Sequence, residues 1–390
     1  MSITPLMPVY PRCGVRPVRG EHCHLISEDG TRYLDFASGI AVNLLGHSNE
    51  HLIGAIQRQA ATLMHVSNLY GSPQGEAVAQ RLVDLTFADT VFFTNSGAEA
   101  VECAIKTARA YHQHAGNTER FELITFNNAF HGRTMATISA SDQDKMHKGF
   151  LPLLPGFKYA PFDDLAAAEA LIGPHTAGFL VEPIQGEGGV IPATREFMQA
   201  LRALTKKHNL LMIVDEVQSG CGRAGTLFAY ELSDVEPDIM TLGKGIGGGV
   251  PLAALLSTKE VACFEPGDQG GTYNGNPLMT AAGFSVISQL TAPGFLEGVR
   301  ERGEYLKAQL LQLSEERGFN GERGEGLLRA LLLNNDNGPK IVEMARDMGP
   351  DGLLLNAARP NLLRFMPALN VTKDEIDQMM SMLRSVLDAL

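Results

Sequence analysis

A lysine and an aspartate at the ends of two apolar runs are the residues best placed for chemistry. Lys244 lies in TLGKGIGGGVP, and Asp215 ends the run LLMIVD, 29 positions earlier. If both runs are parallel strands, their carboxyl ends lie at one edge of the sheet, where open α/β sheets bind ligands. An amine and a carboxylate there indicate a cofactor site. The alternative is that Lys244 is a solvated strand-end lysine and GIGGG only a turn.

Pyridoxal phosphate chemistry requires such a pair. A lysine holds this cofactor as a Schiff base, and an acidic residue keeps the pyridine nitrogen protonated so that the ring can accept electrons. Burial among glycines and apolar strands would help Lys244 to move protons near neutral pH, because desolvation penalises the charged amine. We therefore expect Lys244 and Asp215 to be catalytic, with pyridoxal 5'-phosphate as the cofactor.

Composition sets the limits of function. The 390 residues, 44% hydrophobic and 19% charged, are ordinary for a globular protein of two domains. The net charge of −12 argues against a nucleic-acid partner. Five scattered cysteines without C-x-x-C predict neither a disulfide framework nor a metal site. Prolines interrupt the N-terminal segment, which therefore lacks the apolar core of a signal peptide or membrane span, and the predicted location is cytoplasmic.

Short apolar runs alternate with amphipathic helices. Strands buried on both faces are predicted at 90–94, 122–126, 178–183, 210–216, 238–243 and 252–257, and helices at 98–114 and 195–208. This alternation predicts an α/β fold with a mainly parallel sheet in a large domain, residues 46–275. Long helical patterns at 297–318 and 371–390, with strand patterns around a turn at Asp29 and Gly30, predict a smaller α+β domain from residues 1–45 and 276–390.

The segments that follow two of these strands offer groups for a cofactor. After TVFFT, Ser96 and Glu99 form a capping-box pattern at a helix start that suits a phosphate, although a plain helix cap is the alternative. After ELITF, Phe130 could stack on a flat ring and Arg133 could grip a carboxylate. The alternatives are a core phenylalanine and a surface arginine. His131 is interpreted as structural, because Lys244 already supplies a proton carrier.

Two more strand ends add carboxylates and ring contacts. Glu182 and Glu187 lie beside glycines in VEPIQGEGG, and one of them is expected to face a binding arginine. In EVQSGCGRAG, Val217 could contact one face of a ring and Gln218 its phenolic oxygen. A nucleotide-binding protein is disfavoured because GKGIGGG lacks the G-x-x-x-x-G-K-[ST] pattern and no G-x-G-x-x-G opens a helix after the first strand.

Taken in order, these motifs resemble one family. DFASGIAVNLLGH, TNSGAEAVE, FHGRT, VEPIQGEGG, IVDEVQSGCGRAG, TLGKGIGGG, GTYNGNP and LLRFMPALNVT occur with the order and spacing of the class III, ω-amino-acid type pyridoxal phosphate aminotransferases of fold type I. The likeness covers essentially the whole chain. It implies a mainly parallel seven-stranded sheet in the large domain and a smaller α+β domain built from both chain ends.

The resemblance also implies roles for individual residues. The cofactor site falls on Ser96, Gly97, Ala98, Phe130, Asp215, Val217, Gln218 and Lys244. Thr272 is expected to donate to the phosphate of the neighbouring subunit's cofactor, which implies a homodimer with shared active sites. A mutase, racemase or decarboxylase of the same fold, and a catalytically silent homologue acting as a scaffold, are the competing interpretations.

Substrate handling is implied by charged residues and one aliphatic residue. Arg133 is expected to bind the α-carboxylate of an ω-amino donor and later the γ-carboxylate of glutamate, and Arg364 the α-carboxylate of glutamate. Glu187 would pair with Arg364 while the donor is bound. An aliphatic residue at Ile40, where relatives acting on ornithine carry tyrosine, favours an N-acylated donor.

The resemblance predicts a reaction of arginine biosynthesis. N2-acetylornithine and 2-oxoglutarate would give N-acetylglutamate semialdehyde and glutamate. Succinylornithine, N-acyl diaminopimelate, ornithine and 4-aminobutyrate stay as alternative donors, and Gly271 replaces a serine that is usual in the family. The acyl group therefore stays open.

Overall fold

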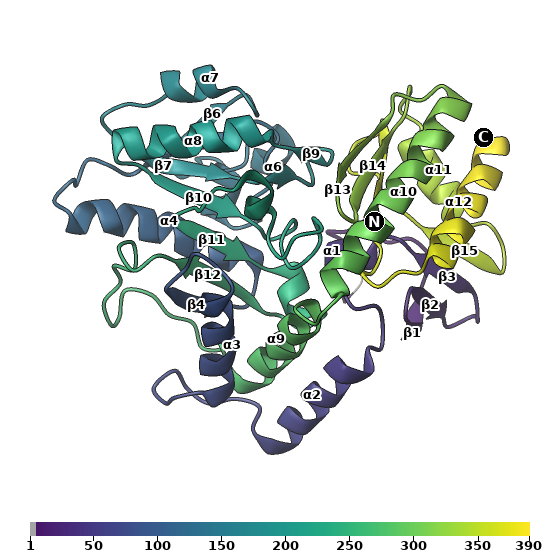
Figure 1. Cartoon of the computed structure of the whole chain (residues 1–390), viewed down its shortest axis with the longest axis horizontal. Coiled ribbons are helices and arrows are strands. Elements are labelled where there is room, and N and C mark those ends of the chain that lie inside the picture. Colours follow the sequence, from purple (N-terminus) through teal and green to yellow (C-terminus); the bar gives the residue numbers. More distant parts are fainter. Residues whose placement is uncertain (1–4) are drawn as a thin grey trace.

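A computed structural model of the chain describes residues 5–390; residues 1–4, part of the predicted small domain and of the proline-interrupted N-terminal segment, lie outside the described residues. The central feature is a sheet of seven strands (Figure 1). In spatial order they are β4 (Thr90–Thr94), β12 (Ala253–Ser257), β11 (Ile239–Leu242), β10 (Leu211–Asp215), β7 (Thr176–Val181), β5 (Glu122–Phe126) and β6 (Phe157–Ala160).

The sheet is mainly parallel, as predicted. Only β12 runs antiparallel to its neighbours, β11 and β4. The link between β11 and β12 is too short for a helical crossover, so the chain must return antiparallel. The strand β6 escaped the sequence analysis because it lies at the edge, where three of its four side chains are only half-buried, and FKYA forms no continuous apolar run.

Both faces of this sheet are covered by helices. Along β10, Leu211 and Ile213 pack with the apolar residues of α4, whereas Met212 and Val214 pack with those of α8. Alternate side chains of a strand point to opposite faces, so two buried faces require the unbroken apolar run seen in the sequence. The two covering helices are α4 (Gly97–His114) and α8 (Arg195–His208).

The helices have the following bounds. They are α1 (Ser38–Ala41), α2 (Glu50–Thr62), α3 (Pro73–Asp84), α4, α5 (Met135–Ser139), α6 (Asp144–His147), α7 (Leu165–Ala170), α8, α9 (Pro277–Leu290), α10 (Phe295–Arg317), α11 (Gly338–Arg346) and α12 (Lys373–Asp388), with the 3-10 turns η1 (Ala229–Ser233) and η2 (Lys244–Gly247). Within residues 5–390, none of these helices is long and apolar enough to cross a membrane.

Smaller sheets join the two ends of the chain. A four-stranded sheet has the order β1 (Pro17–Glu21), β2 (His24–Ser27), β3 (Arg32–Asp35) and β15 (Asp351–Leu354), and a three-stranded sheet has the order β13 (Glu322–Glu325), β14 (Leu328–Leu332) and β16 (Leu362–Phe365). A short hairpin pairs β8 (Ile184–Gln185) with β9 (Ile191–Pro192). The purple N-terminal strands lie beside the yellow helix α12 in Figure 1.

The predicted domain boundary falls just before α9. This helix packs against α2, α3 and the turn η2 that begins at Lys244. It therefore packs at the edge of the large sheet where Lys244 lies, while α10 to α12 pack with the smaller sheets. The division into 46–275 and the two terminal segments stays a prediction.

Candidate active site

Lys244 follows β11 at the carboxyl edge of the large sheet. It opens η2 with φ of +43°, and the preceding Gly243 allows close contact: a Cβ there would lie 3.1 Å from a Val217 methyl group and 3.2 Å from the Cα of Gly97. Three strand ends therefore meet around this lysine. Burial lowers the pKa of Lys244, although nearby carboxylates, first Glu187 and then Asp215, oppose the shift.

A cavity of about 240 Å³ opens in front of Lys244. It is lined by Gly97, Ala98, Phe130, His131, Gly132, Arg133, Glu182, Glu187, Asp215, Val217, Gln218 and Lys244. Nine of the predicted site residues line it. A larger open groove of about 880 Å³ lies elsewhere, beside Phe87, Arg202 and Tyr230. Arg202 in that groove is held by Asp238 through two hydrogen bonds. Lys244 and Asp215 line the smaller cavity and not this groove.

Asp215 is fixed by three donors. The imidazole of His131 is joined through Nδ1 to Oδ2 at 2.7 Å, while Val217 N–H and the Thr241 hydroxyl donate to Oδ1 at 3.0 and 3.2 Å. Burial alone lowers the pKa of His131, but the hydrogen bond and charge of Asp215 outweigh it and the net shift is upward. The imidazole and the two other donors thus fix a carboxylate at one end of the cavity.

The sequence analysis missed the contact between His131 and Asp215. The order of strands in the sheet could have predicted this contact. The strands β5 and β10 both flank β7, so the residues that follow them lie close together. Nε2 of His131 is buried without a hydrogen-bond partner among the described residues. His131 lines the cavity, and an unsatisfied buried polar atom on such a residue is typical of a functional site.

The helix α4 begins at the cavity wall. Ser96 and Glu99 form the predicted capping box, so the Ser96 side chain is committed to the helix end, while Gly97 and Ala98 line the cavity. A Cβ at Gly97 would lie 2.6 Å from Val217 Cγ1, so only glycine permits this approach. The N–H groups and the dipole at the start of a long helix favour a bound anion, so this end of α4 suits a phosphate.

A charged network closes another side of the cavity. Arg364 donates through Nη1 to Glu187 at 2.8 Å and to Gln218 at 3.1 Å, and its other nitrogens donate to Asn356. Burial by itself raises the pKa of Glu187, but the adjacent guanidinium brings the net shift below the usual value. Asn356, which the sequence analysis missed, is placed by an isolated bridge to β16.

Arg133 and Phe130 form a second contact pair at the mouth. The guanidinium lies over the Phe130 ring at 5.4 Å, and the arginine is exposed. Phe130 N–H donates to Glu182, whose pKa burial raises to about 8. Of the two carboxylates that followed the third strand, Glu187 therefore contacts an arginine and Glu182 holds the backbone beside the aromatic ring.

Four predicted residues do not line the cavity: Ser96, Arg364, Thr272 and Ile40. Ser96 caps α4, and Arg364 contacts the lining residues Glu187 and Gln218. Thr272 is exposed in the segment before α9, next to Gly271, whose carbonyl accepts from Asn68. Ile40 has φ of +64° and packs against the apolar cluster that includes Ile184, Leu362 and Met366. Within one chain, Thr272 and Ile40 are therefore separate from the groups around Lys244.

The residues present fit pyridoxal phosphate. An amine, a carboxylate anchored by an imidazole, an aromatic ring and a helix N-terminus converge on one cavity with an unpartnered buried nitrogen. Gly97, Ala98, Phe130, Val217 and Gln218 would hold the phosphate and ring. This set defines the site class of a cofactor-dependent amine-transferring enzyme.

Comparison with known proteins agrees. The family model for aminotransferase class-III matches residues 10–387, and the chain belongs to this family of pyridoxal phosphate-dependent aminotransferases. It is 62% identical to acetylornithine aminotransferase from Ralstonia nicotianae, over 95% of this chain and 94% of that one. It is 51% identical to acetylornithine aminotransferase 2 from Bordetella bronchiseptica, over 100% and 98%.

Solved structures confirm the fold type. The ornithine aminotransferase of Toxoplasma gondii ME49 superimposes with a TM-score of 0.93 at 30% identity, covering 98% of this chain and 93% of that one. The N-acetylornithine aminotransferase of Stenotrophomonas maltophilia K279a gives 0.85 at 35% identity, with 97% of each chain covered. The fold is thus shared by enzymes named for different amino donors.

Proposed function

We propose that this aminotransferase transfers the δ-amino group of N2-acetylornithine to 2-oxoglutarate, giving N-acetylglutamate semialdehyde and glutamate. The observation that carries the proposal is the Arg364–Glu187 pair on the cavity wall, together with the exposed Arg133 at its mouth. Two arginines, one of them masked, suit a site that alternates between a monocarboxylate donor and a dicarboxylate acceptor.

The donor is inferred from the sequence relatives and from Ile40, which lies outside the cavity lining of its own chain and is assigned to the donor's α-amino end by the family resemblance alone. An isoleucine side chain offers no acceptor for an ammonium group, so a free α-amino group would enter an apolar environment without a partner. An N-acyl group removes that charge. The relatives named for acetylornithine support this choice over ornithine.

Lys244 is proposed as the proton carrier. Pyridoxal phosphate, when bound, supplies a carbonyl that condenses with amines and a ring that accepts the electron pair of the substrate carbon. The Nζ of Lys244 would hold the cofactor and, once released from it, would take a proton from the substrate carbon and carry it. Burial lowers the pKa of Lys244, which favours the neutral amine that this role requires.

Asp215 is proposed to hold the proton of the ring nitrogen. Its two oxygens are occupied by His131, Val217 and Thr241, which fix the direction of the carboxylate. A preorganised charge of this kind needs no rearrangement during the reaction. Val217 and Phe130 would then face the ring, and Gln218 its phenolic oxygen.

The Arg364–Glu187 pair is proposed to act as a gate. While Glu187 accepts from Arg364, the guanidinium is neutralised and the apolar stem of the donor meets no free charge. When 2-oxoglutarate binds, its α-carboxylate replaces Glu187. Glu187→Gln should therefore raise KM for the donor more than KM for 2-oxoglutarate, as measured by steady-state kinetics of each half-reaction; equal changes would contradict the gate.

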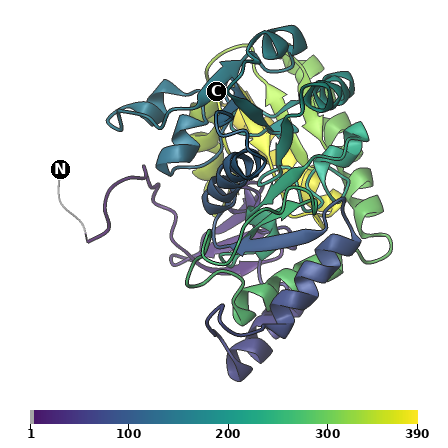
Figure 2. The same ribbon diagram turned by 90° about the vertical axis from the view of Figure 1, so that its left-hand side faces the viewer.

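A homodimer with shared sites is also proposed. Near Thr272, three large side chains are mostly exposed: Leu69, Tyr70 and Tyr273. The described N-terminal segment before β1, in which Met7 and Tyr10 are exposed, extends away from the rest of the chain (Figure 2). Exposed apolar groups of this kind are typical of interfaces. In such a dimer, Thr272 would reach the partner's cofactor phosphate. A cytoplasmic location completes the proposal.

A donor panel tests the proposal. Purified holoenzyme is supplied with 2-oxoglutarate and, in turn, N2-acetylornithine, N2-succinylornithine, ornithine, 4-aminobutyrate and an N-acyl diaminopimelate, and glutamate formation is measured. The highest kcat/KM is expected for N2-acetylornithine. A higher value for ornithine or 4-aminobutyrate would overturn the donor assignment while leaving the aminotransferase class intact.

A further inference from the structure

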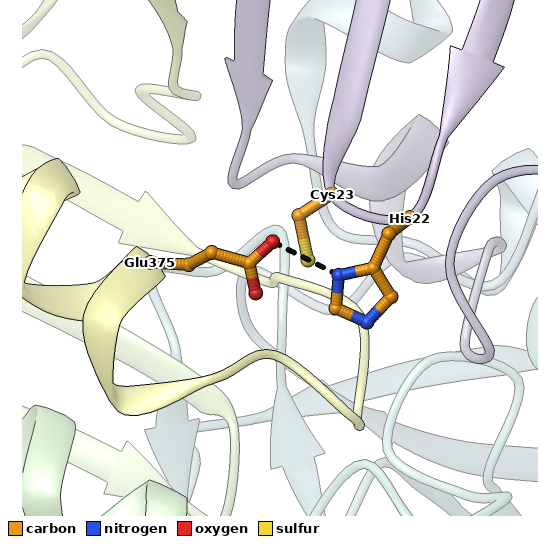
Figure 3. Close-up of side chains that lie close together, drawn as sticks. All are labelled: His22, Cys23 and Glu375. Atoms are coloured by element: carbon orange, nitrogen blue, oxygen red, sulfur yellow. Dashed lines mark hydrogen bonds and ion pairs between the residues drawn. The ribbon is translucent and has the colours of Figure 1, made fainter.

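A group of metal-ligating side chains lies at the junction of the N-terminal hairpin and the last helix. His22, Cys23 and Glu375 converge there (Figure 3), and Nδ1, Sγ and a carboxylate oxygen all lie within 4.8 Å of one another. None of the three lines the active-site cavity. The group joins residues 353 positions apart, so no local sequence pattern announces it.

The turn that presents two of these side chains has an unusual composition. His22 and Cys23 form the two-residue connection between β1 and β2, in which Glu21 pairs with His24. His22 has φ of +50°, a conformation for which such turns normally use glycine or asparagine. The strained histidine is held by backbone hydrogen bonds to His47. The sequence thus departs from the usual composition of such turns at the residue whose imidazole contacts Glu375.

We propose that His22, Cys23 and Glu375 bind a divalent transition-metal ion, for which Zn²⁺ has the best chemical match. Zinc takes nitrogen, thiolate and carboxylate ligands at about 2.0–2.3 Å in tetrahedral sites. His22 Nδ1 is already 2.9 Å from Glu375 Oε1, so small side-chain rotations suffice. The mixed donor set disfavours Mg²⁺ and Ca²⁺, which prefer oxygen alone. The fourth position is left for water or His24, whose Nδ1 lies 4.0 Å from the same oxygen.

Charge balance supports a metal ion. Glu375 supplies a carboxylate that already accepts hydrogen bonds from His22 and from the Thr372 N–H. Cys23 supplies a buried thiol, and coordination to a cation would displace its proton. One thiolate, one carboxylate and a neutral imidazole then cancel the charge of Zn²⁺.

The remaining groups around the site do not compete for the ion. Asp35 is occupied by His47 at 2.8 Å and by the N–H groups of Ala37 and Ser38. Glu375 keeps Oε2 for the cap of α12, where Thr372 donates at 2.8 Å, and so offers Oε1 to the metal. The His22 side chain is 37% exposed, which provides an entry path for the ion. Zinc would thus link the hairpin turn to α12.

The test uses holoenzyme dialysed against a chelator and then titrated with Zn²⁺. Calorimetry should give one ion per chain, and zinc-edge X-ray absorption should give one sulfur neighbour at about 2.3 Å with nitrogen or oxygen neighbours nearer. Bound ion should also raise Tm in proportion to its saturation. A shell of nitrogen and oxygen alone, or no binding, would show that His22 and Glu375 form only an ion pair.

Matched variants assign the ligands. Cys23→Ser should remove the sulfur neighbour, and His22→Asn should weaken Zn²⁺ binding at least about 10-fold, because each removes a ligand. Cys13→Ser and His51→Asn, both at exposed positions, should change neither. Aminotransferase activity reports that each variant is folded. If Cys23→Ser does not fold, His22→Asn carries the test alone, since its side chain is partly solvated, and unchanged affinity there would overturn the site.

Discussion

Two histidine–carboxylate pairs of nearly equal length have different surroundings. His131 and Asp215 are 2.7 Å apart with both side chains buried, whereas His22 and Glu375 are 2.9 Å apart with the histidine 37% exposed. In both pairs the pKa of the histidine rises. Around His131 the carboxylate must outweigh full desolvation, while around His22 the hydrogen bond to Glu375 is the largest effect. Burial therefore strengthens the electrostatic attraction within the first pair, and solvent weakens that attraction within the second.

The largest effect is expected from Lys244, which lines the same cavity as His131 and Asp215 and lies apart from His22 and Glu375. Lys244→Ala should reduce kcat by about 10⁴-fold or more, because it removes both the attachment point of the cofactor and the proton carrier. The visible absorbance of the lysine-bound cofactor should disappear with it. Lys259→Ala, at an exposed position after β12, is the control and should behave as the wild type. Normal turnover of Lys244→Ala would refute the assignment.

Removing the charge of each carboxylate should separate the two pairs. Asp215→Asn should lower kcat roughly 10³-fold, because a preorganised charge in a buried site is lost. Glu375→Gln should leave kcat unchanged, since glutamine can retain the cap of α12 and the residue lies away from the cavity. Steady-state rates and the absorbance of the bound cofactor measure this contrast. Similar losses in both variants would mean that the remote pair is coupled to catalysis.

A smaller effect is expected from the histidines. His131→Leu should lower kcat roughly 10-fold to 100-fold, because Asp215 loses a charge-assisted hydrogen bond. His131→Asn should recover much of this loss, since its amide can donate from a position close to Nδ1. The matched variant His22→Asn should have the activity of the wild type. Failure of asparagine to rescue would indicate that His131 acts through its charge or packing.

The smallest effect concerns the pH dependence of stability at the exposed pair. The pKa of His22 is raised above 6.5, so its contribution is present below pH 6.5 and is lost as pH rises through the folded-state value. The pKa of Glu375 is lowered to about 2, so its contribution is present above pH 4.5 and is lost as pH falls toward 2. The stabilisation by the pair is therefore greatest between about pH 4.5 and 6.5.

The partly solvated pair should contribute no more than about 1 kcal/mol. In chelator-containing buffer, the Tm difference between wild type and His22→Asn should be on the order of 1–2 °C at pH 5.5 and smaller at pH 8.5. Scanning calorimetry at both pH values measures it. A difference that grows with pH would have the wrong sign for this ion pair.

The sequence alone determined the main sheet and which residues follow its strands around Lys244. Continuous apolar runs such as Leu211–Asp215 predict strands covered on both faces, and the residues that follow parallel strands must meet at one edge. For that reason, Gly97, Phe130 and Asp215 could be expected near one another, and in the structure all three line one cavity; their roles toward a cofactor stay a prediction. Residues that follow predicted strands can thus be assigned to one edge of the sheet from short sequence segments alone.

Tertiary structure alone decided which side chains pair across the chain. His131 with Asp215, Arg364 with Asn356, and His22 with Glu375 are contacts set by how strands and helices are ordered in space. Periodicity and local spacing carry no information about such partners, because each pair depends on the register of distant elements. The same limit explains why a cysteine in a hairpin turn and a glutamate at the start of α12 became a candidate metal site only once the chain was folded.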